Sequence, residues 1–449
     1  MAPPTRYGDE VVDPSPLLQP LDYVFAGRQA PNRFLKAAMS EKLATWDAKD
    51  VSARGYPTKE LITLYRNWGA GGWGSILTSN VIIDGMNLEA PGNLTIPAEE
   101  GFEGPRFEAY KELATEAKKD GNLLIAQVSH AGRQVEEWIQ PNPISASDIQ
   151  LVSGGFGGKT YGVPRAATKE DIATVINGFA HAAEFLEKAG FDGIELHGAH
   201  GYLLAQFLSP RTNKRTDDYG GSRENRMRLV LEVIAEIKRR VSPKFIVGIK
   251  ANSIEYTPGG VEAEDARALA TELEKAKVDF LELSGGNYEK FAFAHVKDEN
   301  RKRENYFLVQ AEEIRKGLKG EMKVFSTGGF KSVKAMVDSL SIIDGIGLGR
   351  ASAQEPRFPK TLEKLSITGT VEQKFDHDDV LKRFAAAGVQ ISQIANDHEP
   401  VDLSKQENAD GLWNDVMKYY QEAAADADHK LYKWPAVTQV AYPYGDGEM

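Results

Sequence analysis

The chain alternates between short apolar runs and longer amphipathic segments over most of its length. Each apolar run ends at glycine or polar residues, and a segment whose apolar positions recur at helical spacing then follows. This order is typical of a β-strand, a bend and an α-helix. The pattern predicts strands at Asn32–Ala38, Gly74–Asn80, Leu123–His130, Gly193–His197, Phe245–Lys250, Phe280–Gly285, Lys323–Gly328 and Gly345–Gly349.

Helices are predicted between these strands because the apolar residues of each segment share one face. Thr168 and Ser222 precede two of the helices, and an acidic residue follows each in the first turn, as is typical of N-caps. The predicted helices are Lys59–Trp68, Arg106–Lys119, Lys169–Ala189, Glu224–Val241, Ala263–Lys275, Tyr306–Lys316 and Ser332–Ser339.

Strands that alternate with helices pair in parallel, and eight such units favour closure into a (β/α)₈ TIM barrel. The alternative is an open doubly wound sheet, which expects a G-x-G-x-x-G turn after an early strand, and the chain has none there. The sequence therefore predicts an α/β protein built on a TIM barrel. Its active site should lie at the carboxyl ends of the strands, where Gln127, His197, Lys250 and Arg350 stand.

Two segments exceed what a barrel needs. Gln134–Arg165 follows the third strand and is predicted to form a capping insertion. After the eighth strand, two further helices are predicted at Asp378–Ala387 and Ala409–Ala425, without any catalytic motif. We expect an N-terminal segment (residues 1–29), a barrel (30–367) and a C-terminal helical extension (368–449). The extension is compatible with packing on the barrel, covering the site or forming a subunit interface. The sequence therefore allows a homo-oligomer without requiring one.

Composition narrows the class of protein. The formal net charge of −11 leaves no basic excess to neutralise phosphates, which argues against a nucleic-acid partner. The absence of cysteine excludes disulfides, thiolate catalysis and cysteine-based metal sites. Residues 1–29 lack the apolar run of a signal peptide, and no stretch approaches the roughly 20 apolar residues of a membrane span. We expect a cytoplasmic protein without a membrane partner.

The strongest chemical motif is His197-Gly-Ala-His200-Gly-Tyr202-Leu-Leu-Ala-Gln-Phe-Leu-Ser-Pro210, which follows the fourth strand. It puts two imidazoles and a phenol on one short loop. A phenol can protonate a developing carbanion, and neutral imidazoles can hydrogen-bond an oxyanion. Taken alone, the two histidines are equally compatible with structural or metal-binding roles. No Glu, Asp or further His stands at a comparable strand end in an obvious ligand motif, so no metal site is predicted.

This motif resembles the signature of the Old Yellow Enzyme (NADH:flavin oxidoreductase) family. Further similar segments follow in the family's order from Asn32 to Pro359. They are Asn32-Arg33 leading to Ala37-Ala-Met-Ser40, Gln127-Val-Ser-His-Ala-Gly-Arg133, Val247-Gly-Ile-Lys250, Ser326-Thr-Gly-Gly329 and Gly347-Leu-Gly-Arg350. The resemblance implies a TIM barrel that binds FMN and uses NADPH or NADH as reductant.

The resemblance also implies roles for particular residues. His197 and His200 match the pair that holds the carbonyl or nitro oxygen of the substrate, and Tyr202 matches the proton donor. The downstream stretch with Asp217 and Arg226 is expected to brace this loop. The cofactor-binding positions are Ala38, Met39 and Ser40 beside the flavin ring, Asn80 on the second strand, Gln127 at the pyrimidine edge, Lys250 near N1 and O2, and Gly328, Gly329, Gly349 and Arg350 at the phosphate.

The chain departs from the family pattern at two of these positions. Ser40 stands where family members carry Thr or Cys, so tuning of the flavin potential by a thiol is absent. Lys250 stands where many members have Arg, and an ammonium keeps the charge but loses the planar fork of a guanidinium. These changes bear on the redox potential more than on flavin binding.

By resemblance, the expected activity is reduction of the activated C=C bond of α,β-unsaturated carbonyl or nitro compounds. Hydride would come from flavin N5 and the proton from Tyr202. Three alternatives stay open: the same flavin site working in the oxidative direction, a flavin-binding protein with a closed acceptor site, and a Schiff-base aldolase using Lys250. The partner in the expected reaction is a small electrophilic alkene, and its choice would depend on the loops Gln134–Arg165 and Asn287–Asn305.

Overall fold

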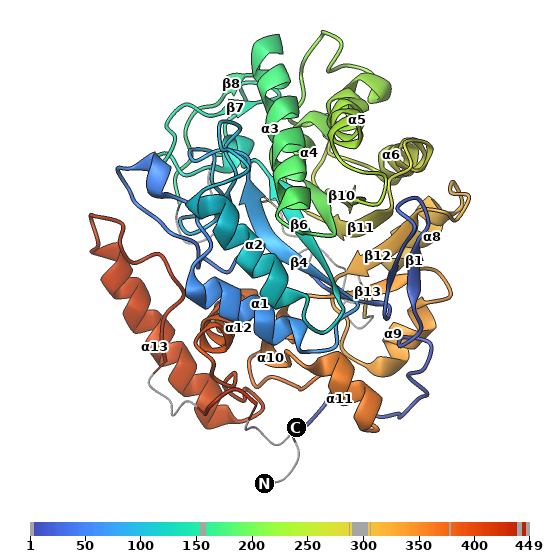
Figure 1. Cartoon of the computed structure of the whole chain (residues 1–449), viewed down its shortest axis with the longest axis vertical. Helices are drawn as coiled ribbons and strands as arrows, with labels where there is room; N and C mark the ends of the chain where they lie inside the picture. The colour runs from blue at the N-terminus through green and yellow to red at the C-terminus, as the bar shows by residue number, and fades with distance from the viewer. Residues whose placement is uncertain are drawn as a thin grey trace.

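The structure is a computed structural model, which describes residues 4–152, 159–286, 288–289, 304–305, 307–376, 379–437 and 442–445. Eight parallel strands form a closed barrel, because β13 pairs with β3 and β3 pairs in turn with β4. The predicted (β/α)₈ barrel is confirmed (Figure 1). The barrel strands are β3 (Phe34–Lys36), β4 (Ser75–Ile82), β6 (Leu123–Ser129), β9 (Gly193–Gly198), β10 (Ile246–Ile254), β11 (Phe280–Gly285), β12 (Lys323–Thr327) and β13 (Gly345–Leu348).

Helices surround the barrel and bury their apolar faces against it. Thr168 caps the longest of them in a capping box with Asp171, and the Ser222 side chain accepts a hydrogen bond from Asn225 N, as the N-cap predictions required. The helices are α1 (Lys59–Gly69), α2 (Pro105–Ala117), α3 (Lys169–Lys188), α5 (Arg223–Arg240), α6 (Ala263–Lys275), α8 (Leu308–Arg315), α9 (Val333–Ser339), α10 (Arg350–Gln354) and α11 (Phe358–Lys364). Tyr306, where the sixth helix was predicted to start, lies outside the described residues.

The largest difference among the barrel strands is at β10. The polar residues Asn252 and Ser253 suggested an end at Lys250, but the backbone keeps pairing with β11 as far as Ile254. A bulge between Asn252 and Ile254 accommodates the change of register. The extra length carries Asn252 up to the loop that follows β9.

A short antiparallel hairpin covers the amino-terminal end of the barrel. It consists of β1 (Leu21–Tyr23) and β2 (Arg28–Ala30), which are too short to show a periodicity in the sequence. Tyr23 is fully buried, shares a hydrogen bond of 3.0 Å with Ser75 Oγ, and packs its ring against Phe280 and Phe325. The hairpin therefore seals the end of the barrel away from the predicted active site.

The insertion after β6 folds onto the barrel mouth. Two short strands, β7 (Ile144–Ser145) and β8 (Arg165–Ala166), pair in parallel, and Glu136 bridges Tyr161. Val135 and Ile139 are buried in one apolar cluster with Tyr202. The insertion thus covers the loop that carries the predicted proton donor.

The C-terminal extension packs on the side of the barrel. Its first helix, α12 (Val380–Ala395), contacts α1 and α10, and α13 (Gln406–Ala424) covers the outer face of α12 (Figure 1). Sequence reasoning placed the end of the first helix at Ala387, which is wrong because Gly388 does not interrupt it. Asp378, the predicted start, lies outside the described residues. Among the described helices, none has the length and apolar character that a transmembrane span requires.

Candidate active site

A pocket of about 170 Å³ lies at the carboxyl ends of the barrel strands. Most of the site residues predicted from the sequence line it together: Ala38, Met39, Ser40, Asn80, Gln127, His197, His200, Tyr202, Lys250 and Arg350. Gly328, Gly329 and Gly349 do not line this pocket. The barrel thus gathers side chains from strands that are far apart in sequence, as parallel strands with a common carboxyl end must.

The two imidazoles form one hydrogen-bonded chain. His197 Nδ1 lies 2.8 Å from Asn80 Oδ1, His197 Nε2 lies 3.0 Å from His200 Nδ1, and His200 Nε2 lies 2.7 Å from Ser284 Oγ. Burial, the neighbouring imidazole and the Lys250 charge hold the pKa of His197 well below its ordinary value. Burial also lowers the pKa of His200 to about 3. Both rings are therefore neutral, and each carries a single N–H.

The backbone at His200 explains how its ring reaches His197. His200 adopts a left-handed conformation with φ of 56°, which is unusual for a residue with a side chain. Asn252 Oδ1 accepts a hydrogen bond of 3.2 Å from the His200 N–H and so stabilises this turn. Asn252 was absent from the sequence-based site because the extent of β10 was underestimated.

Tyr202 stands directly beside this pair. Its ring centroid lies 4.5 Å from that of His197, and its residue is the N-cap of α4 (Leu203–Leu208). The hydroxyl oxygen is 2.7 Å from that of Tyr288. Burial and the nearby Tyr288 raise the pKa of Tyr202 well above its ordinary value, so the phenol keeps its proton at neutral pH.

The residue after Tyr288 is anchored by two arginines, which hold Tyr288 beside Tyr202. Glu289 accepts hydrogen bonds of 2.9 Å from Arg133 and from Arg211 Nε. Substrate choice was expected to depend on the loop Asn287–Asn305, of which residues 287 and 290–303 lie outside the described residues. These include the aromatic pair Phe291 and Phe293.

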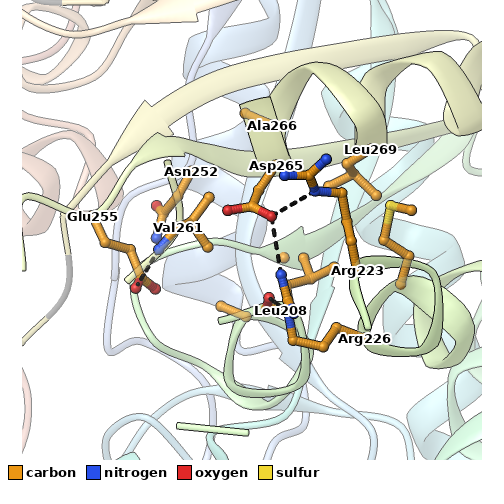
Figure 2. A pocket seen from close by; sticks show the side chains of 12 residues that line it. Leu208, Arg223, Arg226, Asn252, Glu255, Val261, Asp265, Ala266 and Leu269 are labelled. Atoms are coloured by element: carbon orange, nitrogen blue, oxygen red, sulfur yellow. Dashed lines mark hydrogen bonds and ion pairs between the residues drawn. The ribbon is translucent and has the colours of Figure 1, made fainter. Parts of the chain in front are cut away.

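A second, much smaller cavity is lined by Gly198, which precedes the loop that carries His200, and by residues of α4, α5 and α6 (Figure 2). Asp265 accepts hydrogen bonds from Arg223 (2.8 Å) and Arg226 (3.0 Å), and Arg226 also donates to the Leu208 carbonyl (3.1 Å). These bonds connect α5 and α6 to the end of α4. They brace the loop from behind, in the role that the sequence predicted for Arg226.

Buried charges lie under the pocket. Lys250 Nζ is 2.9 Å from Glu282 Oε1, and Gln127 Nε2 donates to Glu195 Oε1 at 2.7 Å. Burial and the Glu282 charge raise the pKa of Glu195 well above its ordinary value, so Glu195 is protonated. The Glu282 carboxylate holds the pKa of Lys250 above its ordinary value despite burial. Lys250 is therefore an ammonium ion and not the free amine that a Schiff base needs.

This arrangement fits the pyrimidine edge of the flavin that the resemblance implies. Because the Gln127 amide donates to Glu195, its Oε1 is left as an acceptor on the pocket side. The Lys250 ammonium adds a positive charge in the same lining. The Ser40 hydroxyl donates a hydrogen bond to Glu89 Oε2 at 3.0 Å.

The expected phosphate position carries clustered cations. Arg350 is the first residue of α10, directly after Gly349, where an added Cβ would meet only Met39 atoms at 3.9–4.0 Å. Burial and the charges of Arg383 and Arg350 lower the pKa of Lys331 to about 8. Three cations near the ends of β12 and β13 favour an anionic group, and the Glu304 and Glu372 charges already balance part of the positive charge at Lys331. Arg383 lies on α12 and was not among the predicted site residues.

The pocket also has an apolar wall that the sequence did not reveal. It is lined by residues of the C-terminal extension: Phe384, Ala387, Gly388, Ile391 and Trp434. The helical spacing of the first four was visible in the sequence, but an apolar stripe indicates packing of any kind. No group of three or more His, Asp or Glu side chains in the described part of the chain could hold a metal ion.

Comparison with known proteins agrees with the fit of the pocket to a flavin. Residues 19–368 match the NADH:flavin oxidoreductase / NADH oxidase family. The chain is 47% identical to the NADH-dependent flavin oxidoreductase nadA of Aspergillus parasiticus over 440 residues, which cover 97% of this chain and 98% of the relative.

Two solved structures share the fold. The Old Yellow Enzyme homologue from Zymomonas mobilis superposes with a TM-score of 0.64 at 23% identity, covering 82% of this chain and 96% of that one. Morphinone reductase in complex with tetrahydroNAD gives a TM-score of 0.64 at 22% identity, with 79% and 92% covered. The family match and the 47% identical relative establish that the chain belongs to the NADH:flavin oxidoreductase / NADH oxidase family, the family of Old Yellow Enzyme, and is an FMN-dependent oxidoreductase.

Proposed function

We propose that this oxidoreductase reduces the activated C=C bond of α,β-unsaturated carbonyl or nitro compounds, with NADH as the reductant. The observation that carries the proposal is the lining of one pocket by His197, His200 and Tyr202 together with Gln127 and Lys250. The choice of NADH over NADPH follows the name of the relative that is 47% identical. When bound, FMN would supply the hydride-transfer chemistry between the nicotinamide and the alkene.

The cofactor would be held by residues from three parts of the site. Gln127 and Lys250 would bind the pyrimidine edge, with Ala38, Met39 and Ser40 beside the ring. Asn80, which already forms a hydrogen bond with His197, would also contact the flavin. Arg350, preceded by Gly349 and accompanied by the loop at Gly328 and Gly329, would bind the phosphate.

The two histidines would hold the carbonyl or nitro oxygen of the substrate. For this, His197 Nε2 and His200 Nδ1, now 3.0 Å apart, must each donate to the same oxygen. His197 then needs a donor at Nδ1, which the Asn80 side-chain amide provides if its NH₂ group faces the ring. His200 accepts at Nε2 from the Ser284 hydroxyl, 2.7 Å away. Ser284 thus selects the His200 tautomer with its N–H at Nδ1, whereas His197 carries its N–H at Nε2 only when the Asn80 amide is turned from the orientation in which Oδ1 faces the ring.

Tyr202 would protonate the carbon next to the activating group. Its raised pKa keeps the proton available at neutral pH and makes the phenol a match for a strongly basic carbanion or enolate. Two neutral N–H donors on the substrate oxygen lower the energy of that enolate. A single such donor typically changes the rate by about 10²–10³-fold.

The test separates the two half-reactions by stopped-flow absorbance. Tyr202→Phe should leave reduction of the enzyme by NADH nearly unchanged and slow its reoxidation by an enone such as cyclohexenone by about 10²-fold or more. Tyr420→Phe, which alters an exposed phenol on α13, is the matched control and should affect neither step. Equal loss in both half-reactions of Tyr202→Phe would contradict the proton-donor role.

A further inference from the structure

The chain beyond α13 returns to the barrel mouth. Three hydrogen bonds fasten it there: Trp46 Nε1 donates to the His429 carbonyl (3.0 Å), Tyr432 Oη to the Ala44 carbonyl (3.1 Å), and Trp434 Nε1 to the Ser40 carbonyl (2.8 Å). Ser40 belongs to the segment that leaves β3 and lines the pocket. The segment 429–434 is therefore attached at three points to residues 40–46, whose first residue lines the pocket.

Trp434 interlocks with α12. The indole packs against Phe384 with ring centroids 5.4 Å apart, and a Cβ added at Gly388 would lie 2.1 Å from Trp434 Cδ2. Only glycine allows the helix and the indole to approach this closely. Trp434 is 6% exposed, so the contact is buried. One face of α12 and the indole together form a continuous apolar wall.

This wall belongs to the same cavity as Gln127 and Lys250. The cavity lining thus combines polar and charged side chains, those of Gln127 and Lys250, with the apolar side chains of the wall. An isoalloxazine has the same division, since its pyrimidine edge carries polar atoms and its dimethylbenzene edge carries only carbon and hydrogen. The match in chemistry points to the flavin as the molecule that the wall contacts.

A second observation ties α12 to the cofactor site. The Gln390 side chain on α12 donates to Gln354 Oε1 at 3.0 Å, and Gln354 is the last residue of α10, which begins at Arg350. The charge of Arg383 on α12 lowers the pKa of Lys331, and so does the charge of Arg350. The helix is therefore fixed to the element that carries the expected phosphate ligand.

We propose that the C-terminal extension completes the FMN site within the same chain, and that Trp434 with the 384–391 face of α12 encloses the dimethylbenzene edge of the flavin. The family match ends at residue 368, so this wall lies outside the part of the chain that defines the family. The relative from Aspergillus parasiticus aligns over 97% of the chain, a span that reaches into the extension. The extension is thus part of the cofactor site and not only an outer layer on the barrel.

The test measures FMN binding to flavin-free protein by isothermal titration calorimetry. Trp434→Ala should raise the Kd for FMN by about 10- to 100-fold, because it removes a large buried contact. Trp434→Phe, which keeps an apolar ring, should raise it by no more than about 5-fold. Trp413→Ala on α13 removes a tryptophan that packs away from the pocket and should leave the Kd unchanged.

Thermal melting of the flavin-free variants separates folding from binding. If Trp434→Ala does not fold, Phe384→Ala provides the measurement, because Phe384 is only partly buried and still lines the pocket. Its Kd for FMN should rise by about 3- to 30-fold. A folded Trp434→Ala or Phe384→Ala with the Kd of the wild type overturns the proposal. The proposal is also overturned if either variant changes the KM for the enone but not the Kd for FMN, since the wall would then contact the substrate and not the flavin.

Discussion

Tyr202 and Tyr288 share a hydrogen bond of 2.7 Å between their hydroxyl oxygens, with Tyr202 buried and Tyr288 partly buried beside it. When Tyr202 gives up its proton, the Tyr288 hydroxyl is the neighbouring donor that can stabilise the phenolate. Tyr288→Phe should therefore slow enone-dependent reoxidation by about 3- to 10-fold, the effect of one neutral hydrogen bond. Stopped-flow absorbance measures this rate, and reduction by NADH should stay unchanged. A normal reoxidation rate would show that Tyr288 is structural only.

The buried histidines should make stability depend on pH. An unfolded histidine has a pKa of about 6.5, whereas burial lowers the pKa of His200 to about 3. Between these values the unfolded chain binds more protons, so the free energy of unfolding falls as the pH falls, by up to about 1.4 kcal/mol per pH unit for each such histidine. His200→Asn should reduce this slope, measured by urea denaturation between about pH 7 and about pH 5.

The control for this experiment is His398→Asn, which changes a histidine in an isolated β-bridge with Pro443, outside the pocket. Its slope should equal that of the wild type. The same slope for His200→Asn and wild type would mean that the His200 imidazole takes up a proton in the folded protein, against the neutral pair described above.

Lys250 and Glu282 form a buried ion pair whose side chains are 5% and 0% exposed. Lys250→Met leaves the carboxylate without its cation and should lower the free energy of unfolding by about 3–5 kcal/mol. Lys250→Met/Glu282→Gln removes both charges and should recover most of that loss. Urea denaturation of the flavin-free proteins checks both values. A double variant as unstable as the single one would show that packing by Lys250, and not charge pairing, accounts for the loss.

Arg350 can be tested as a phosphate ligand by comparing two flavins. Arg350→Met should weaken FMN binding by about 10- to 100-fold, because a charge-assisted hydrogen bond contributes about 1.5–3 kcal/mol. It should hardly change the Kd for riboflavin, which lacks the phosphate. Arg66→Met removes an exposed arginine that pairs with Asp397 and serves as the control. Equal weakening of FMN and riboflavin would contradict the phosphate role.

The sequence predicted the barrel because its information is local and repeated. Apolar strand cores, Thr168 and Ser222 as N-caps, and the motif from His197 to Pro210 all depend on residues near one another in the chain. The parallel barrel then requires that strand ends meet at one face, so most of the predicted pocket lining followed.

Tertiary contacts decided the rest. The hairpin at Leu21–Ala30 has too few residues for a periodic signal, and Asn252 reaches His200 only because β10 keeps pairing with β11 beyond its apolar part. Tyr288 lies beside Tyr202 because two arginines from other loops hold Glu289. Trp434 joins the cavity through a glycine and a carbonyl distant in sequence. Local pattern determines which elements form, whereas long-range packing selects the side chains that share the space between them.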